Sequence, residues 1–183
     1  MKLTNQPRNY GIISILLHWS MALIIVGLFA LGLWMTSLSY YDPWYRQGPW
    51  IHKSIGLLLA ALFAFRWIWR ISNITPQPSD SLKPIEKKLA HGAHLAFYGL
   101  IATTLMSGYL ISTADGRAIE VFNWFHIPAM GVAFEDQEDI AGDIHYYVAF
   151  TLIGLAAFHG LAAIKHHVID KDNTLRSMTF PKH

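Results

Sequence analysis

The feature that most constrains this chain is the apolar stretch of residues 143–166, which carries one histidine near each end, His145 and His159. The two histidines are fourteen residues apart, and in a helix this separation is a rotation of about 1400°, only about 40° short of four full turns, and a rise of about 21 Å. Both imidazoles would therefore project from nearly the same helix face, one near each surface of a bilayer about 30 Å thick. This geometry suits a helix that holds two flat cofactors stacked along the membrane normal.

Composition places the chain among integral membrane proteins. Of its 183 residues, 53% are hydrophobic and only 14% are charged, whereas charged residues usually supply about a quarter of a soluble protein. Apolar runs of about twenty residues or more are long enough to cross a bilayer as helices. The net charge of +2 is too small and too unevenly spread to indicate nucleic acid as a partner. Because the chain has no cysteine, iron–sulfur clusters and covalent haem attachment are excluded, and metal chemistry must rest on the ten histidines.

The sequence predicts an all-α fold, one integral membrane four-helix bundle over residues 1–183, with spans at about residues 12–36, 51–71, 89–113 and 144–165. The first run follows a basic leader, as in a signal peptide. However, it is about 25 residues long instead of the usual 7–15, and no A-x-A site closes it, so we interpret it as a span. The long connection at 114–142 has room for a short surface helix around residues 120–125.

The positively charged residues predict the orientation. With four spans, both termini and the loop between the second and third spans share one side. That side collects eleven of the fourteen Lys and Arg residues, Lys182 among them, and the other side keeps Arg46, Lys53 and Arg117. Lysine and arginine accumulate in cytoplasmic loops, so both termini are predicted to be cytoplasmic.

Depth then sorts the histidines of the spans into two levels. His52 and His145, on different spans, lie at the outer level, whereas the inner level contains His159 and, as its partner, His18 or one of the pair His91 and His94. Two levels of inward-facing imidazoles suit two six-coordinate b-type haems bound between helices, each with two axial histidines. Packing histidines are the simpler alternative, but ionisable groups at membrane depth are costly and usually functional. Zinc is disfavoured, because two ligands per level without carboxylate or thiolate make poor closed coordination.

Other polar residues receive other interpretations. Arg66 and Arg70 share a helix face at the end of the second span. Snorkelling toward lipid headgroups is the favoured interpretation, and pairing with a cofactor carboxylate or a lipid phosphate is the alternative. Four further histidines are interpreted as solvated or interfacial, one in the long connection and three in the tail: His126, His166, His167 and His183.

Several motifs carry a family resemblance: IISILLHW at 12–19, WIHK at 50–53, LAHGAHL at 89–95, KDNTL at 171–175, and the spacing of His145, Gly154 and His159. With them the sequence resembles the bacterial cytochrome b561 family, small four-helix di-haem cytochromes of the inner membrane. The resemblance covers nearly the whole chain. It implies that His18 and His159 bind the inner haem iron and that His52 and His145 bind the outer one, and it leaves His91 and His94 as non-ligands.

The resemblance also implies a function. It indicates a multi-pass protein of the bacterial inner membrane, in contact with lipid, that holds two haem b groups and transfers electrons to or from ubiquinone or another quinone. An oxidoreductase activity with superoxide as a candidate donor is implied as well, although no catalytic residue is assigned. For Lys53, beside His52, contact with lipid phosphate is the favoured interpretation, and among single residues it is the best candidate for steering an anion toward an otherwise acidic outer surface. The alternative function is a haem-b membrane-anchor subunit serving a dehydrogenase, reductase or hydrogenase.

Overall fold

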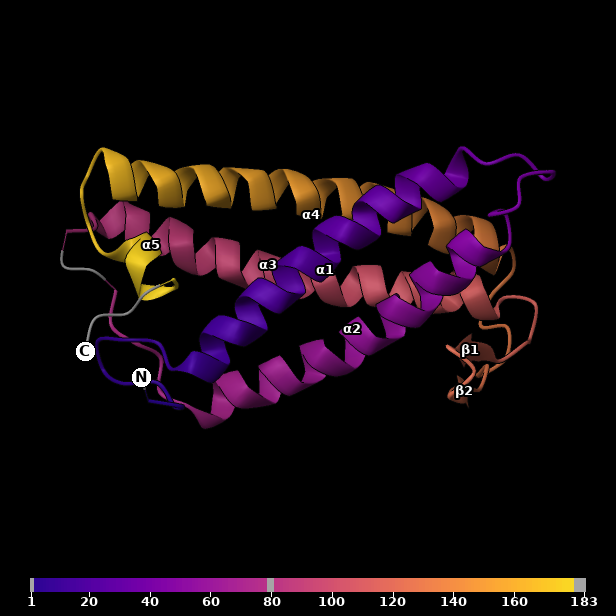
Figure 1. The fold of residues 1–183 in the computed structure, drawn as a ribbon, viewed down its shortest axis with the longest axis horizontal. Helices are drawn as coiled ribbons and strands as arrows, with labels where there is room; N and C mark the ends of the chain where they lie inside the picture. Colours follow the sequence, from indigo (N-terminus) through magenta and orange to yellow (C-terminus); the bar gives the residue numbers. More distant parts are fainter. Residues whose placement is uncertain (1, 79–80, 180–183) are drawn as a thin grey trace. The chain divides into compact units, whose positions relative to one another are not determined.

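The computed structural model describes residues 2–78 and 81–179 of the chain. Its four long helices are α1 (Ile12–Thr36), α2 (Gln47–Ser72), α3 (Pro84–Thr113) and α4 (Gln137–Val168) (Figure 1). Two short strands, β1 (Ile119–Val121) and β2 (Phe125–Ile127), lie between α3 and α4 in the sequence, and a short helix, α5 (Thr174–Ser177), follows α4. Lys182, counted for the predicted orientation, and His183, predicted to be solvated or interfacial, lie outside the described residues.

Each of the four long helices is long and apolar enough to cross a membrane, which confirms the all-α class with four membrane-spanning helices. Their apolar side chains mostly point outward. In the most apolar window of α4 only 6% of the residues are buried, and Leu23 and Phe158 expose 72% and 74% of their surface. Apolar surface on this scale is unfavourable in water, so lipid contacts these helices.

The helices differ from the predicted spans mainly at their starts. α1 covers the predicted residues, whereas α2, α3 and α4 each begin several residues earlier. The added turns of α3 and α4 are polar and carry acidic residues, which are favourable at a helix start. α3 begins at Pro84, whose fixed φ suits the first helical position, and Glu86 Oε2 accepts the backbone N–H of Lys83 at 2.9 Å. Helices therefore extend past the apolar residues that define the spans.

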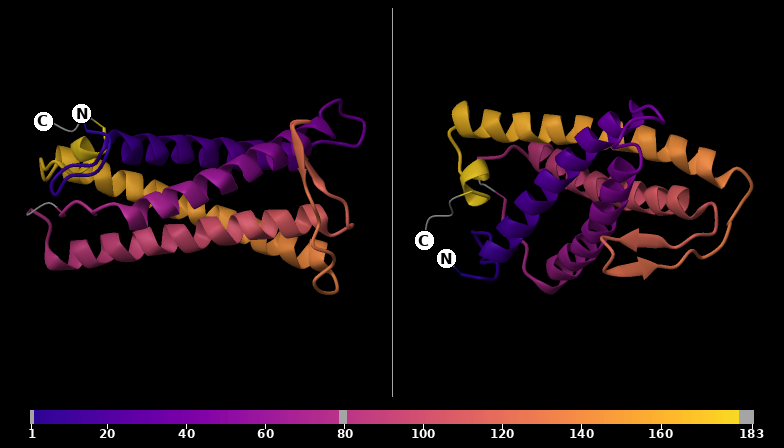
Figure 2. Two further views of the ribbon diagram at one scale, coloured as in Figure 1. Left: turned by 90° about the horizontal axis from the view of Figure 1, so that it is seen from below. Right: turned by 45° about the vertical axis from the view of Figure 1, so that its right-hand side comes forward.

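The connection after α3 forms a β-hairpin, so the short helix expected around residues 120–125 was wrong. β1 and β2 pair antiparallel with Val121 opposite Phe125 (Figure 2). Ile119 and Val121 are 3% and 0% exposed and point to the same face, as alternate residues of a strand do. Phe122, directly after β1, has a φ of 45°, a left-handed conformation that reverses the chain.

The chain divides into two compact units, each of which takes part of every long helix. Unit 1 contains Met1–Ala22, Leu62–Tyr98 and Gly154–His183, and unit 2 contains Leu23–Ala61 and Gly99–Ile153. The single transmembrane domain and the cytoplasmic position of both termini stay predictions.

Unit 1 joins the helix portions at the leader and the tail. Trp69 Nε1 of α2 donates to Ser14 Oγ of α1 at 3.0 Å. Trp19 Nε1 of α1 donates to the carbonyl oxygen of Met178 at 2.7 Å, which holds the tail against α1. Leu17 and Met21 of α1 are buried in this unit.

Unit 2 fastens the hairpin to α2 through one buried serine. Ser54 is 0% exposed. Its hydroxyl donates to the carbonyl oxygen of Glu120 at 3.4 Å and accepts the N–H of Phe122 at 3.2 Å. At the start of α4, Gln137 Nε2 donates to the carbonyl oxygen of Leu110 at 2.9 Å, which ties α4 to α3.

Candidate haem sites

Unit 1 brings together three histidines from three helices. The ring centres of His18 (α1) and His159 (α4) lie 6.3 Å apart, and those of His94 (α3) and His159 lie 5.7 Å apart. Phe97 packs edge-on against His159 with ring centres 5.4 Å apart. His91 is exposed. The structure therefore separates the two histidines of α3, since only His94 joins the cluster.

Unit 2 brings together the two histidines predicted for the outer level. His52 comes from α2 and His145 from α4, and their ring centres lie 6.2 Å apart with an angle of 70° between the ring planes. Both side chains are half-buried.

The ring spacing fits a metal ion between the members of a pair. Imidazole nitrogen binds first-row metals at about 2.0 Å, so two imidazoles on opposite sides of one ion place their ring centres roughly 6 Å apart. The pairs His18–His159 and His52–His145 both match this value. The 5.7 Å spacing of His94 and His159 lies close to it as well, so His94 is a competing ligand on geometry.

The orientation of His145 is set by α3, a helix that supplies no predicted ligand in unit 2. His145 Nδ1 lies 2.9 Å from the carbonyl oxygen of Thr104 and 3.3 Å from Ser107 Oγ. A carbonyl oxygen only accepts, so Nδ1 carries the hydrogen and Nε2 keeps a free lone pair. This is the tautomer that a metal-binding histidine needs, held by the kind of backbone contact that orients such ligands.

Glycines bring helix backbone against both rings of this pair. A Cβ atom at Gly108 of α3 would lie 3.1 Å from His145 Cε1, and one at Gly32 of α1 would lie 3.3 Å from His52 Cε1. His52 Nδ1 is buried without a hydrogen-bond partner among the described residues. Such an atom costs about 1–3 kcal/mol, so His52 is not placed there for stability alone.

Sequence reasoning did not single out Thr104 or Ser107 as residues that orient His145. The available signal was the adjacent Ser107 and Gly108 in a span without a predicted ligand, since small residues in membrane helices mark close approach. Thr104 acts through its carbonyl oxygen, and a backbone atom leaves no signal in the sequence.

At the end of α4, His166 was expected to be solvated or interfacial, but its side chain is only 13% exposed and its Nδ1 lies 2.7 Å from Asp170 Oδ2. Glu86, His166 and Asp170 are close enough to share a metal ion. Lys165 Nζ, however, lies 2.6 Å from Asp170 Oδ2 and 3.3 Å from Glu86 Oε1. Its hydrogen bond lowers the pKa of Asp170. The lysine already supplies the positive charge, and the cluster joins α4 to the start of α3.

The basic residues predicted for the outer side differ in their pairing. Arg117 Nε donates to Asp115 Oδ2 at 2.7 Å, and the hydrogen bonds from Arg117 lower the pKa of Asp115. Lys53 is exposed beside His52 and forms no ion pair with a described residue. The charge of Arg117 is thus balanced by Asp115, whereas Lys53 has no described carboxylate within ion-pair distance.

Four membrane-spanning helices and histidines that face each other from different helices define a class: helical membrane proteins that bind a metal cofactor between helices. The family described as prokaryotic cytochrome b561 matches residues 9–181. The chain is 48% identical to cytochrome b561 homolog 2 of Escherichia coli (strain K12) over 178 residues, 97% of this chain and 95% of that protein. It is 27% identical to the probable superoxide oxidase CybB of Yersinia pestis over 172 residues, 93% of this chain and 96% of that protein.

The chain therefore belongs to the prokaryotic cytochrome b561 family, as its motifs implied. It is a membrane cytochrome of a family that binds haem b.

Proposed function

We propose that the protein is a di-haem cytochrome b that transfers electrons across the bacterial inner membrane between a small redox partner and the quinone pool. One observation carries this proposal: two histidine pairs have the same ring spacing, 6.3 and 6.2 Å, and each pair joins two different helices. His18 and His159 are the proposed ligands of the inner haem iron, and His52 and His145 are those of the outer one.

The residues of the chain favour electron transfer over chemistry at the metal. Bound haem b supplies a one-electron oxidation and reduction at its iron. Two histidines would hold each haem iron, and the site would then support electron transfer and not the binding of a small molecule at the metal. α4 carries one member of each pair, which makes it the element common to both sites.

Superoxide is the proposed donor, with ubiquinone or another quinone as acceptor. The name of the 27% identical relative supports this choice, as does the exposed, unpaired Lys53 beside His52, because a local positive charge raises the encounter rate of an anion. Oxidation of two superoxide anions to two O₂ molecules releases two electrons, and these electrons with two protons reduce one quinone to its quinol.

The test uses the purified protein in liposomes that contain ubiquinone. We expect two haem b per chain, two components in a redox titration, and quinol formation when superoxide is generated outside. A preparation with fewer than two haems rejects the di-haem proposal. Two haems without quinone turnover, together with a co-purifying soluble dehydrogenase, reductase or hydrogenase, would instead identify an anchor subunit.

A matched pair of variants tests the donor. Lys53→Gln should lower the superoxide-driven rate several-fold at low ionic strength and less at high salt, because screening weakens steering. The double variant Arg117→Gln/Asp115→Asn should have little effect, because it removes both members of an existing ion pair and leaves the net charge unchanged. Equal rates for the two variants would remove Lys53 from the proposal.

A further inference from the structure

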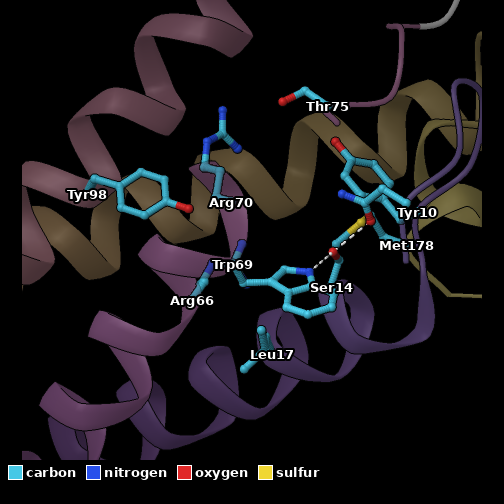
Figure 3. A pocket seen from close by; sticks show the side chains of 10 residues that line it. Tyr10, Ser14, Leu17, Arg66, Trp69, Arg70, Thr75, Tyr98 and Met178 are labelled. Carbon is cyan, nitrogen blue, oxygen red and sulfur yellow. Dashed lines mark hydrogen bonds between the residues drawn. The ribbon is translucent and has the colours of Figure 1, made fainter. Parts of the chain in front are cut away.

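A small cavity in unit 1 has charges that the described residues leave unbalanced. Its volume is about 50 Å³, and α2 contributes Arg66, Trp69 and Arg70 to its lining. Figure 3 shows these side chains together with Tyr98 of α3 and with Tyr10 and Ser14 near the start of α1. Pockets for whole organic ligands usually have about 300–1,000 Å³. This cavity therefore fits one small end of a ligand whose body lies elsewhere.

Both arginines are half-buried at the end of a membrane-spanning helix. Neither forms an ion pair with a described carboxylate, and none of the residues that line the cavity is acidic. The Arg70 guanidinium lies 5.5 Å from the centre of the Tyr98 ring, which holds it at the cavity. Guanidinium stays charged in proteins, and an unpaired charge at a membrane span is costly. The two guanidinium groups therefore favour a ligand with negatively charged oxygen atoms.

Three other polar side chains of the cavity lining are hydrogen-bonded in a chain. Trp69 Nε1 donates to Ser14 Oγ at 3.0 Å, and Ser14 Oγ donates to Asn5 Oδ1 at 2.7 Å. Asn5 Nδ2 in turn donates to the carbonyl oxygen of Ile74 at 2.9 Å. These bonds occupy Trp69, Ser14 and Asn5, and the two guanidinium groups are the charged donors that the lining offers to a ligand.

The cavity adjoins the histidine cluster of unit 1. Leu17, which lines it, directly precedes His18. Tyr98, which also lines it, follows His94 by four residues, one turn farther along the same face of α3. A haem carries two propionate carboxylates on one edge, and two arginines match them in number and in charge. Guanidinium and carboxylate also form strong paired hydrogen bonds.

We propose that Arg66 and Arg70 bind the propionate carboxylates of the haem held by His18 and His159. The proposal rests on the inner haem proposed above and adds to it the residues that fix the cofactor's anionic edge. It replaces the interpretation of both arginines as residues that snorkel to lipid headgroups.

The test measures the two haem potentials of the purified protein in Arg66→Gln, Arg70→Gln and wild type. Reduction adds a negative charge to the haem, so loss of a nearby positive charge should disfavour the reduced form. We expect about a tenfold fall in the ratio of reduced to oxidised inner haem at a fixed ambient potential, equal to about 59 mV for one electron. The outer component should not move. Arg8→Gln, a change at an exposed arginine outside the cavity, should shift neither component.

The outcomes separate this proposal from the preceding one. Loss of the inner haem with retention of the outer haem also supports it, because the anchoring contacts are then gone. An unchanged inner potential together with less bound phospholipid, measured as phosphorus, would assign the arginines to lipid phosphate and overturn it. If a glutamine variant loses both haems, the lysine variant at the same position should restore them by restoring the charge, and failure to do so overturns it. Absence of an inner component in wild type would reject the di-haem function itself.

Discussion

The histidines of unit 2 and those of unit 1 are held in different ways. In unit 2 each ring lies against a glycine of a neighbouring helix, and the carbonyl oxygen of Thr104 fixes His145. In unit 1 three histidines share one cluster, no hydrogen bond to His18 or His159 is found among the described residues, and two arginines line an adjacent cavity. Unit 2 positions its two histidines through tight packing, whereas unit 1 has a third histidine in its cluster and nearby positive charge. Substitutions that add volume should therefore damage the outer site, and substitutions that change charge should affect the inner one.

The largest effect is expected from replacing each histidine of α4 in turn. His145→Ala should remove the outer haem and His159→Ala the inner one, so that each variant keeps about one haem per chain. Both variants replace a histidine of α4 by alanine, so they differ only in the unit that they affect. Haem content per chain and the surviving redox component measure the result. Retention of both haems in His145→Ala would end the assignment of His52 and His145 as a pair.

His94 provides the sharpest test of the cluster in unit 1. His18→Ala should lose the inner haem, and His94→Ala should retain it. The reason is that the His18–His159 spacing of 6.3 Å repeats the 6.2 Å spacing in unit 2, whereas the His94–His159 spacing is shorter. Haem content and the low-spin signal of the oxidised inner haem distinguish the two variants. The reverse result would make His94 the ligand opposite His159.

Long sequence patterns predicted the fold well, whereas short ones did not. Four long apolar runs predicted four membrane-spanning helices, and histidines at similar depths predicted the meeting of His52 with His145. The strands of the hairpin were missed because each has only three residues, too few for alternation to stand out. The polar first turns of α3 and α4 were missed because hydropathy marks the membrane-crossing part and not the helix end.

The contacts that orient the rings lie beyond what one sequence shows. Gly108 and Ser107 are recognisable as small residues, but their meaning depends on which side chain of α4 faces them. Likewise, His91 and His94 are three residues apart and looked equivalent, yet the packing of α3 exposes one and places the other beside His159. Such distinctions arise from helix rotation, which a single sequence does not fix.

The tight packing of unit 2 predicts sensitivity to a single methyl group. Gly108→Ala would place a Cβ atom 3.1 Å from His145 Cε1, so the ring must shift. Overpacking of this kind costs about 1–3 kcal/mol, enough for roughly tenfold or greater weakening of outer haem retention. Gly92→Ala is the control on the same helix, since Gly92 is exposed and a methyl group added there would meet no neighbouring atom within 4 Å among the described residues. Haem loss during dilution into apomyoglobin measures both, and equal loss rates would contradict the packing argument.

A smaller effect is expected from the hydroxyl near His145. Ser107→Ala removes an oxygen 3.3 Å from Nδ1 but leaves the carbonyl oxygen of Thr104 in place. Hydrogen bonding at Nδ1 makes the imidazole a stronger donor and favours oxidised iron. Its partial loss should therefore raise the outer potential, by about 20–60 mV if one ordinary hydrogen bond is involved. The inner component serves as the internal reference in the same titration, and a shift of both components would point to a general change in structure.

The smallest effect concerns two aspartates outside the helices, one in each unit. Burial raises the pKa of Asp172 in unit 1, but hydrogen bonds from Thr174 and Ser81 outweigh burial and leave the pKa below its ordinary value. A carboxyl with a depressed pKa stabilises the fold above its unfolded pKa of about 3.9, and this stability is lost as pH falls through the lower folded pKa. Asp172→Asn should lower the thermal midpoint by about 2–4 °C at pH 7 and flatten its decline below pH 4.

Asp115 in unit 2 is the matched case, because its pKa is also lowered, by hydrogen bonds from Arg117. Its ion pair is exposed, however, with 84% of the Arg117 side chain accessible. Exposed pairs contribute little to stability, so Asp115→Asn should leave the midpoint unchanged at both pH values. The Soret band followed at a fixed heating rate measures both variants. An equal fall in the thermal midpoint of the two variants would show that the burial of Asp172 does not make its hydrogen bonds more stabilising than the exposed pair of Asp115.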